Sequence, residues 1–129
     1  MTRWLAAIAA AGLLMAAARR YAALVAVEGR SMAPSLAPGD WLVIESLSYR
    51  RRAPRAGEVV VARDPRDPGR ELIKRAYPDA AGAYRLLGDA EAASTDSRTF
   101  GNVPEDAVRW RAAFRYWPPA RIGLVRTAG

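Results

Sequence analysis

Two residues of this chain, Ser31 and Lys74, have types and settings suited to covalent chemistry. Ser31 follows an apolar segment, residues 24–27, and stands beside Gly29 just before a proline-containing turn. Lys74 is the one lysine among twenty basic residues and lies in a short apolar segment. Arginine keeps its proton in proteins, whereas a buried lysine loses it readily and then acts as a base. A serine activated by a lysine is a known variant of the Ser-His-Asp triad.

Each of these residues also has an ordinary structural explanation when it is taken alone. A serine in a turn commonly bonds to neighbouring backbone groups. A single lysine in an arginine-rich chain can be an accident of composition. Chemistry is therefore expected only if the fold brings Ser31 and Lys74 together.

The 129 residues include no histidine and no cysteine, which excludes several kinds of site. A Ser-His-Asp triad, a cysteine nucleophile, a disulfide and zinc sites built on these residues are all ruled out. A base for acyl transfer must then be lysine, a carboxylate or a terminal amine. We expect an active site without a metal ion or cofactor.

The net charge of +7 favours an anionic partner, either nucleic acid or a membrane surface. The arginines are dispersed, apart from a cluster at residues 50–52 and Arg55, and no nucleic-acid-binding motif accompanies them. We therefore expect no nucleic-acid partner, and we assign membrane lipid as the partner of the cluster.

Residues 4–18 form an apolar run without any charged residue. As a helix the run covers about 22 Å, short of the roughly 30 Å hydrocarbon core of a bilayer. A removable signal peptide and a helix lying in the membrane interface are alternatives to a membrane anchor. We predict a single-pass anchor in residues 1–20 and one domain in residues 21–129.

After the apolar run, short β-type segments alternate with turns rich in proline and glycine. No long segment repeats apolar residues at helical spacing, so we predict a mostly β domain. The turn residues 64–69 predict a hairpin between two of the strands. The predicted strands are residues 24–27, 41–45, 58–63, 72–77, 84–87 and 108–116.

Residues 88–101 form a long connection between the last two predicted strands. A loop of this length in a small domain is usually functional or disordered. The alternative is a solvent-exposed polar loop in which Asp96 and Arg98 form a structural ion pair. Composition alone favours that alternative.

Four stretches, in this order, resemble the motif boxes of the type I signal peptidase family of serine-lysine membrane proteases. The stretches are residues 29–36 with 38–43, 57–61, 72–75 and 88–98. The second stretch has Glu58 where the family has aspartate. The resemblance covers about residues 24–125.

This resemblance implies a coiled β-sheet or partial barrel, with Ser31 as the nucleophile and Lys74 as the general base. It also implies that Ser94 hydrogen-bonds to the lysine and that Asp96 with Arg98 braces the loop around it. Met32 is expected to line the site next to the nucleophile. Burial is expected to lower the pKa of the lysine, so that a neutral amine is available.

The chain also departs from the family pattern. Gly29 stands where some members have a serine that helps to form the oxyanion hole, which leaves backbone N–H groups for that role. Ala90 replaces a common asparagine, and the family's Gly-Leu-Pro-Gly-Asp segment and large secondary β-domain are missing. The chain resembles minimal members, such as the proteases that mature nickel-type superoxide dismutase and the mitochondrial inner-membrane peptidases.

The resemblance implies a serine endopeptidase that removes leader peptides after small residues through an acyl-enzyme. Its partners are then the leader of a precursor protein and membrane lipid. The expected location is the cell membrane, with the domain on the extracytoplasmic side. The distribution of charge weakly favours a cytoplasmic domain instead, because two arginines, Arg19 and Arg20, follow the apolar run and only Arg3 precedes it.

Two alternatives to the leader peptidase remain open. One is a repressor-type serine-lysine autoprotease, which shares the segment around Ser31 and a downstream lysine. The other is a non-catalytic, membrane-tethered β module that binds anionic lipid through residues 50–55 and needs neither Ser31 nor Lys74.

Overall fold

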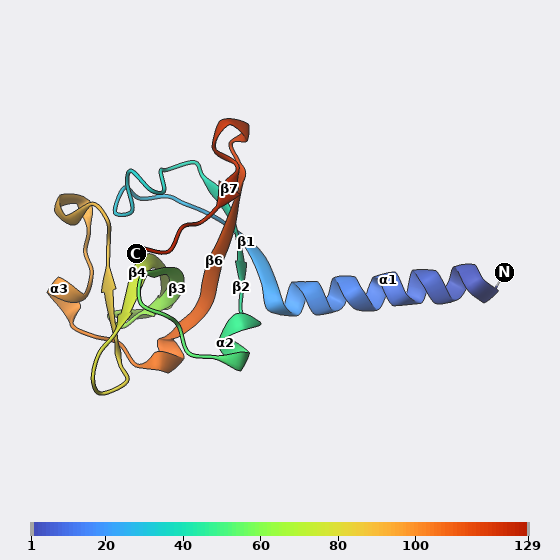
Figure 1. The fold of residues 1–129 in the computed structure, drawn as a ribbon, viewed down its shortest axis with the longest axis horizontal. Helices are drawn as coiled ribbons and strands as arrows, with labels where there is room; N and C mark the ends of the chain where they lie inside the picture. The colour runs from blue at the N-terminus through green and yellow to red at the C-terminus, as the bar shows by residue number, and fades with distance from the viewer. Residues whose placement is uncertain (1, 129) are drawn as a thin grey trace.

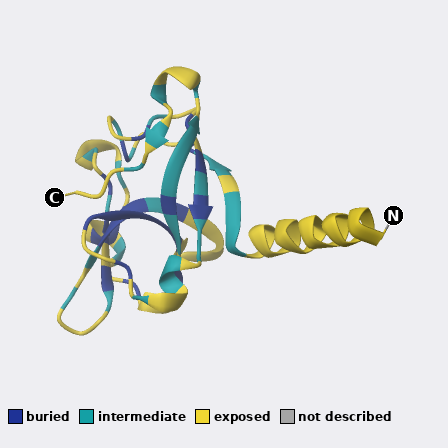
Figure 2. Ribbon diagram, turned by 45° about the vertical axis from the view of Figure 1, so that its right-hand side comes forward, coloured by how far each residue is buried: buried dark blue, intermediate teal, exposed yellow. Residues whose placement is uncertain are grey.

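A single helix leads into an antiparallel β-sheet in the computed structural model, which describes residues 2–128 (Figure 1). The helix, α1 (Thr2–Tyr21), is rich in alanine and leucine, the residues that favour helices most strongly. It projects away from the sheet, and none of its residues is buried (Figure 2). The predicted helix is confirmed and extends to Tyr21. Within residues 2–128, no helix is long and apolar enough to cross a membrane, so the predicted single-pass anchor is not supported.

Seven strands form one sheet in which every pairing is antiparallel. The strands are β1 (Ala22–Ala26), β2 (Trp41–Glu45), β3 (Glu58–Asp64), β4 (Asp67–Pro78), β5 (Tyr84–Leu87), β6 (Val108–Trp117) and β7 (Gly123–Leu124). Their order across the sheet is β1-β2-β6-β3-β4-β5, and β7 pairs with β6. The predicted mostly β fold after one helix is confirmed.

The hairpin between β3 and β4 is tighter than predicted. The strand predicted at residues 72–77 starts at Asp67, so only Pro65 and Arg66 connect the two strands. The Asp64 carboxylate accepts a hydrogen bond from the Arg66 backbone N–H at 2.9 Å, which closes the turn early. β7 was not predicted, because a strand of two residues is too short to show any periodicity.

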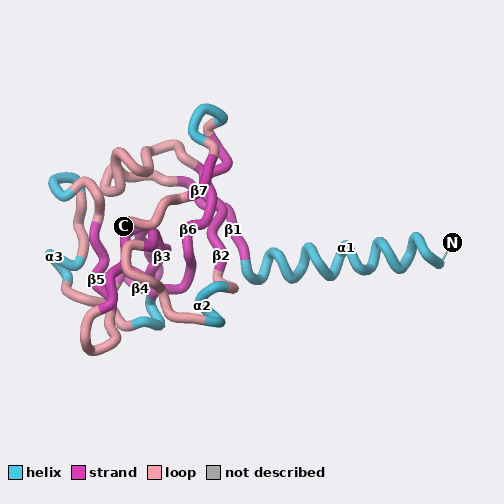
Figure 3. The backbone as a smooth tube through the Cα atoms, in the orientation of Figure 1, coloured by secondary structure: helices cyan, strands magenta, loops and turns pink. Residues whose placement is uncertain are grey.

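Short helices occupy the connections between strands (Figure 3). They are α2 (Ser48–Arg51), α3 (Ser97–Phe100) and the 3₁₀ turns η1 (Glu91–Ala93), η2 (Glu105–Ala107) and η3 (Pro119–Arg121). The predicted loop at residues 88–101 thus contains both η1 and α3.

β3 lies near the centre of the sheet and is buried on both faces. Because side chains alternate along a strand, Val59 and Val61 contribute to one apolar cluster while Val60 and Ala62 contribute to another. The first cluster includes Met32, next to Ser31 in the sequence. A run of β-branched residues suits a strand that is covered on both sides.

Candidate active site

Ser31 and Lys74, which are 43 residues apart in the sequence, meet at one edge of the sheet. Ser31 lies in the turn that follows β1, and Lys74 lies on β4. The Lys74 Nζ atom donates a hydrogen bond to Ser31 Oγ at 2.7 Å. Lys74 is only 5% exposed, so its amine is held away from bulk water.

The pairing of β4 explains why the amine of Lys74 is buried yet reachable. On one side Lys74 pairs with Val60 of β3. On the other side β5 pairs with β4 only from Arg75 onward, so the edge of β4 before Arg75 has no strand partner within the described chain. A cleft of about 380 Å³ opens along this edge. Its lining consists of residues 26–29, 31, 32 and 70–74.

Burial lowers the pKa of Lys74, because the charged ammonium loses its hydration. The negative charge of Asp96 opposes this shift. The positive charges of Arg70, Arg66 and Arg98 lower the pKa further. The net direction is downward, toward a neutral amine.

The predicted supporting residues Gly29 and Met32 both line the cleft. Met32 is 1% exposed and packs into the apolar cluster behind Ser31. Gly29 lies at the exposed rim, one residue before the Arg30–Ser31 peptide. Within residues 2–128, the Ser31 backbone N–H has no hydrogen-bond acceptor.

Asp96 organises the loop beside Lys74 and is 1% exposed. Its carboxylate accepts hydrogen bonds from Ser94 Oγ at 2.8 Å and from the Gly88 N–H at 2.9 Å. It also forms the predicted ion pair with Arg98, at 2.5 Å. Burial alone would raise the pKa of Asp96, but the hydrogen bonds from Arg98, Gly88 and Ser94 hold it well below its ordinary value.

Ser94 donates its hydroxyl proton to Asp96, and no hydrogen bond joins it to Lys74 in the described chain. The predicted contact between Ser94 and the lysine therefore stays a prediction. A hydroxyl that donates to a carboxylate keeps its lone pairs, so it can still accept a bond from an ammonium group.

Gly88 lies where the loop that follows β5 contacts the turn that carries Ser31. A Cβ atom at this position would collide with the Ser94 side chain and would lie 2.6 Å from the Ser31 carbonyl oxygen. The same carbonyl accepts a hydrogen bond from the Ala90 N–H at 2.8 Å. Glycine at residue 88 thus permits the close approach of the two loops that carry Ser31 and Ser94.

Sequence reasoning assigned no role to a polar network that ties the nucleophile turn to the lysine strand. Arg75, next to Lys74, is buried and pairs with Asp89 at 2.6 Å and 2.9 Å. Asp89 also accepts a hydrogen bond from Ser35 Oγ at 2.7 Å, four residues after the nucleophile. The only available signal was that Arg75 and Asp89 lie inside the motif stretches.

A second ion cluster holds the far side of the same turn. Asp40, which is 2% exposed, lies 3.2 Å from Arg115 and 3.3 Å from Arg121. Both arginines come from the C-terminal part of the chain, and Arg115 also donates to the Ser35 carbonyl at 2.9 Å. The turn that carries Ser31 is therefore fixed from two directions.

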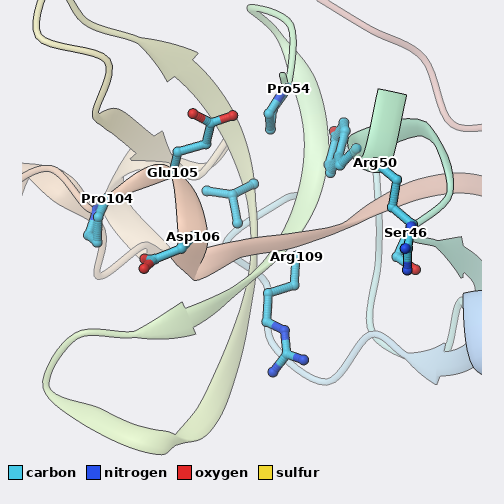
Figure 4. A pocket seen from close by; sticks show the side chains of 9 residues that line it. Ser46, Arg50, Pro54, Pro104, Glu105, Asp106 and Arg109 are labelled. Atoms are coloured by element: carbon cyan, nitrogen blue, oxygen red, sulfur yellow. The ribbon is translucent and has the colours of Figure 1, made fainter. Parts of the chain in front are cut away.

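A larger cavity, of about 660 Å³, lies away from the dyad (Figure 4). Figure 4 shows Ser46 and Arg50 on one side of it and Pro104, Glu105 and Asp106 on the other. Neither Ser31 nor Lys74 lines this cavity. Within residues 2–128, no group of three or more acidic side chains stands ready to hold a metal ion.

The sequence is similar to a known protein family and to several known proteins. The sequence matches the family "Signal peptidase, peptidase S26" over residues 1–77 and 80–117. It is 38% identical to mitochondrial ATP-independent inner membrane protease subunit 1a of Arabidopsis thaliana, over 78% of this chain and 73% of that protein. It is 29% identical to mitochondrial inner membrane protease subunit 1 of Homo sapiens, over 81% and 75%. It is 31% identical to probable signal peptidase I-2 of a Synechocystis strain, over 77% and 65%.

Proposed function

Because the chain belongs to the signal peptidase family, peptidase S26, and is thus a protease, we propose that it is a serine endopeptidase with a Ser31/Lys74 dyad. It removes leader peptides from precursor proteins, cutting after small residues. The observation that carries this proposal is the 2.7 Å separation between Lys74 Nζ and Ser31 Oγ, at a lysine that is almost fully buried.

Lys74 acts as the general base. Its lowered pKa makes the neutral amine more abundant near neutral pH than at a solvent-exposed lysine, whose pKa is about 10.4. When Lys74 is neutral, its Nζ lone pair can accept the proton of the Ser31 hydroxyl across the same 2.7 Å, which reverses the direction of the hydrogen bond. Arginine has no such neutral form in proteins, which is why the one lysine of the chain is needed here.

The reaction proceeds through an acyl-enzyme. As Ser31 Oγ attacks the substrate carbonyl carbon, its proton passes to Lys74 Nζ and the carbonyl electrons move onto oxygen. The resulting ammonium gives the proton to the departing amine when the peptide C–N bond breaks. Water then attacks the ester carbonyl while Lys74 takes a proton from it, and Lys74 returns this proton to Ser31 Oγ as the ester C–O bond breaks.

Backbone groups stabilise the oxyanion of the tetrahedral intermediates. The Ser31 N–H is suited to this role, since no acceptor within residues 2–128 occupies it. Gly29 adds no side-chain donor. Ser94, held by Asp96, orients the lysine ammonium after it has taken the proton, and the Asp96–Arg98 pair braces that loop.

The substrate binds in an extended conformation along the unpaired edge of β4, as other peptides add to exposed sheet edges. Met32 and Ile73 line the cleft next to the dyad. The apolar contacts that these two residues offer suit small side chains just before the cut. In a finer form of the proposal, the chain serves one dedicated precursor, such as that of a nickel-type superoxide dismutase, because it resembles the minimal members of the family.

The test is cleavage of a leader peptide with an Ala-x-Ala site, in detergent, by the wild type and three variants. Ser31→Ala and Lys74→Arg should both abolish cleavage while the circular dichroism spectrum stays unchanged. Ser46→Ala, a serine variant outside the cleft, should cleave at the wild-type rate. Residual activity in a folded Lys74→Arg protein would overturn the dyad.

Two further readouts separate the alternatives to a leader peptidase. A serine-directed covalent probe should label the wild type and not Ser31→Ala; a native protein that resists labelling is a non-catalytic module. Cleavage confined to the protein's own chain, with none of an added peptide, would indicate an autoprotease.

A further inference from the structure

The last residue of α1, Tyr21, contacts both the segment that leads into α2 and Arg50 of α2, and arginines gather around this junction. The Ser46 N–H donates to the Tyr21 carbonyl at 2.9 Å, which joins the segment before α2 to the last residue of α1. Two guanidinium groups lie over the Tyr21 ring, that of Arg20 at 5.6 Å and that of Arg50 at 5.2 Å from its centroid. Figure 1 shows α2 beside the base of α1.

Four arginines lie in the last turns of α1 and α2, and we call them the junction cluster: Arg19, Arg20, Arg50 and Arg51. All four are exposed. Within residues 2–128, none of them forms a salt bridge.

The nearby acidic residues are engaged elsewhere or face away. Glu45 bonds to the Ser48 N–H at 2.9 Å and to Arg111 at 2.8 Å. Glu105 and Asp106 stand across the large cavity from Arg50 (Figure 4). The structure therefore leaves the positive charge of the junction cluster for an external anion.

Arg52 and Arg55 must be set apart from this cluster, although the sequence places them in the same basic stretch. Arg52 pairs with Glu58 at 2.9 Å, and Glu58 also accepts a bond from the Arg55 backbone N–H at 2.7 Å. Glu58 is buried, and these bonds anchor the segment to β3. Arg52 is thus a structural arginine, whereas Arg55 is fixed through its backbone and its side chain forms no salt bridge within residues 2–128.

The partner must also suit α1, whose apolar side chains have no cover. The large ones are 60–76% exposed: Trp4, Leu5, Ile8, Leu13, Leu14 and Met15. They lie in a run with no charged residue on any side, whereas a helix that packs on a protein groove keeps one polar face. A partner that suits both features must surround α1 with apolar groups and offer anions at the end of the helix. An anionic lipid bilayer has both properties.

We propose that the junction cluster binds anionic phospholipid headgroups while α1 enters the apolar part of the same bilayer. Tyr21 takes the interfacial position, where aromatic side chains concentrate at membranes. Each exposed arginine near an anionic surface contributes about 1 kcal/mol, which corresponds to about fivefold in partitioning. This binding does not depend on the proposed protease chemistry.

The test measures partitioning of the full chain between two kinds of vesicle, phosphatidylcholine alone and phosphatidylcholine containing phosphatidylglycerol. The wild type should prefer the anionic vesicles, and the preference should weaken at high salt, because exposed charges are screened. Arg50→Gln combined with Arg51→Gln should reduce the preference by about 25-fold. Partitioning into phosphatidylcholine alone should not change, since α1 is intact.

A charge-matched control separates a local surface from general basicity. Arg63→Gln combined with Arg85→Gln removes the same charge from exposed positions on β3 and β5. This variant should keep the wild-type preference, and both double variants should cleave a soluble peptide at the wild-type rate. Equal partitioning of the wild type into both vesicles, or an equal loss in both double variants, would overturn the proposal.

Discussion

Two regions of this molecule gather arginines, and they do so in opposite ways. Around the cleft, arginines meet buried or half-buried acids: Arg98 with Asp96, Arg75 with Asp89, and Arg115 with Asp40. At the junction of α1 with α2, Arg19, Arg20, Arg50 and Arg51 form no salt bridge within residues 2–128.

The difference shows what each region needs. A dyad needs fixed geometry, because a displacement of about 1 Å can cost about a hundredfold in rate. Paired ions and hydrogen bonds supply this rigidity on both sides of the Ser31 turn. The proposed binding of a fluid anionic partner needs free charge instead, and pairing would neutralise that charge.

The largest effect is expected from breaking the close contact between the two loops at the cleft. Gly88→Ala adds a methyl group that would lie 2.6 Å from the Ser31 carbonyl oxygen and would collide with Ser94. The displaced nucleophile should lower kcat/KM by about a hundredfold. Gly123→Ala is the control: like Gly88, Gly123 has no positive φ, but no atom lies within 4 Å of the added Cβ. Equal losses in the two variants would show that the contact with the Ser31 turn is not responsible.

Removing one charge of the buried pair tests the rigid side of the comparison. Asp96→Asn leaves Arg98 without its counter-charge and should lower the free energy of unfolding by about 2 kcal/mol at pH 7, less than for a fully buried pair because Arg98 is partly exposed. Chemical denaturation measures this directly. A loss as small as the few tenths typical of surface positions would contradict the assigned role.

The same pair gives a pH dependence with a definite sign. The pKa of Asp96 is lower in the folded chain than in the unfolded one, so its ionised form stabilises the fold. This contribution should be complete above about pH 5 and should be lost as the pH falls below about 4, toward the folded pKa. Wild type and Asp96→Asn should therefore converge in stability at low pH, and a constant difference would contradict the assignment.

The sequence predicts a feature of these regions well when neighbouring residues determine it, and poorly when residues far apart in the sequence determine it. Runs of β-branched residues, such as that in residues 58–63, predict the strands. The residue types and the order of the motifs predict the pairing of Ser31 with Lys74. The network of Arg75, Asp89 and Ser35 could not be predicted, because partner choice among nineteen arginines is set only when the sheet closes. The constraint on Gly88 has the same origin.

The basic stretch at residues 50–55 illustrates the same limit. In the sequence it is one cluster, and its assignment to lipid as a whole was an interpretation of composition. The fold divides this stretch, because Arg52 forms an ion pair with Glu58 of β3, whereas Arg50 of α2 lies over the Tyr21 ring. Only three-dimensional contacts separate a structural arginine from an unpaired one.

The smallest effect is expected from a single exposed cation near the dyad. Arg70 lines the cleft, and its positive charge lowers the pKa of Lys74. Arg70→Gln should therefore move the acidic limb of the pH–rate profile to higher pH. Arg85→Gln, whose side chain is not among the charges that shift Lys74, should leave the limb in place. A limb that stays put or moves lower in Arg70→Gln would contradict this part of the electrostatic account.

The most direct test of the central claim is the pH dependence of kcat/KM for the wild type, which reports the pKa of the essential base in the free enzyme. A buried lysine base predicts that activity rises with pH through an apparent pKa well below the ordinary lysine value of about 10.4 and well above the ordinary carboxylate values of about 4. An apparent pKa near 4 would assign the base to a carboxylate. A value at or above 10.4 would show that Lys74 is not depressed, and either result would contradict the Ser31/Lys74 dyad described here.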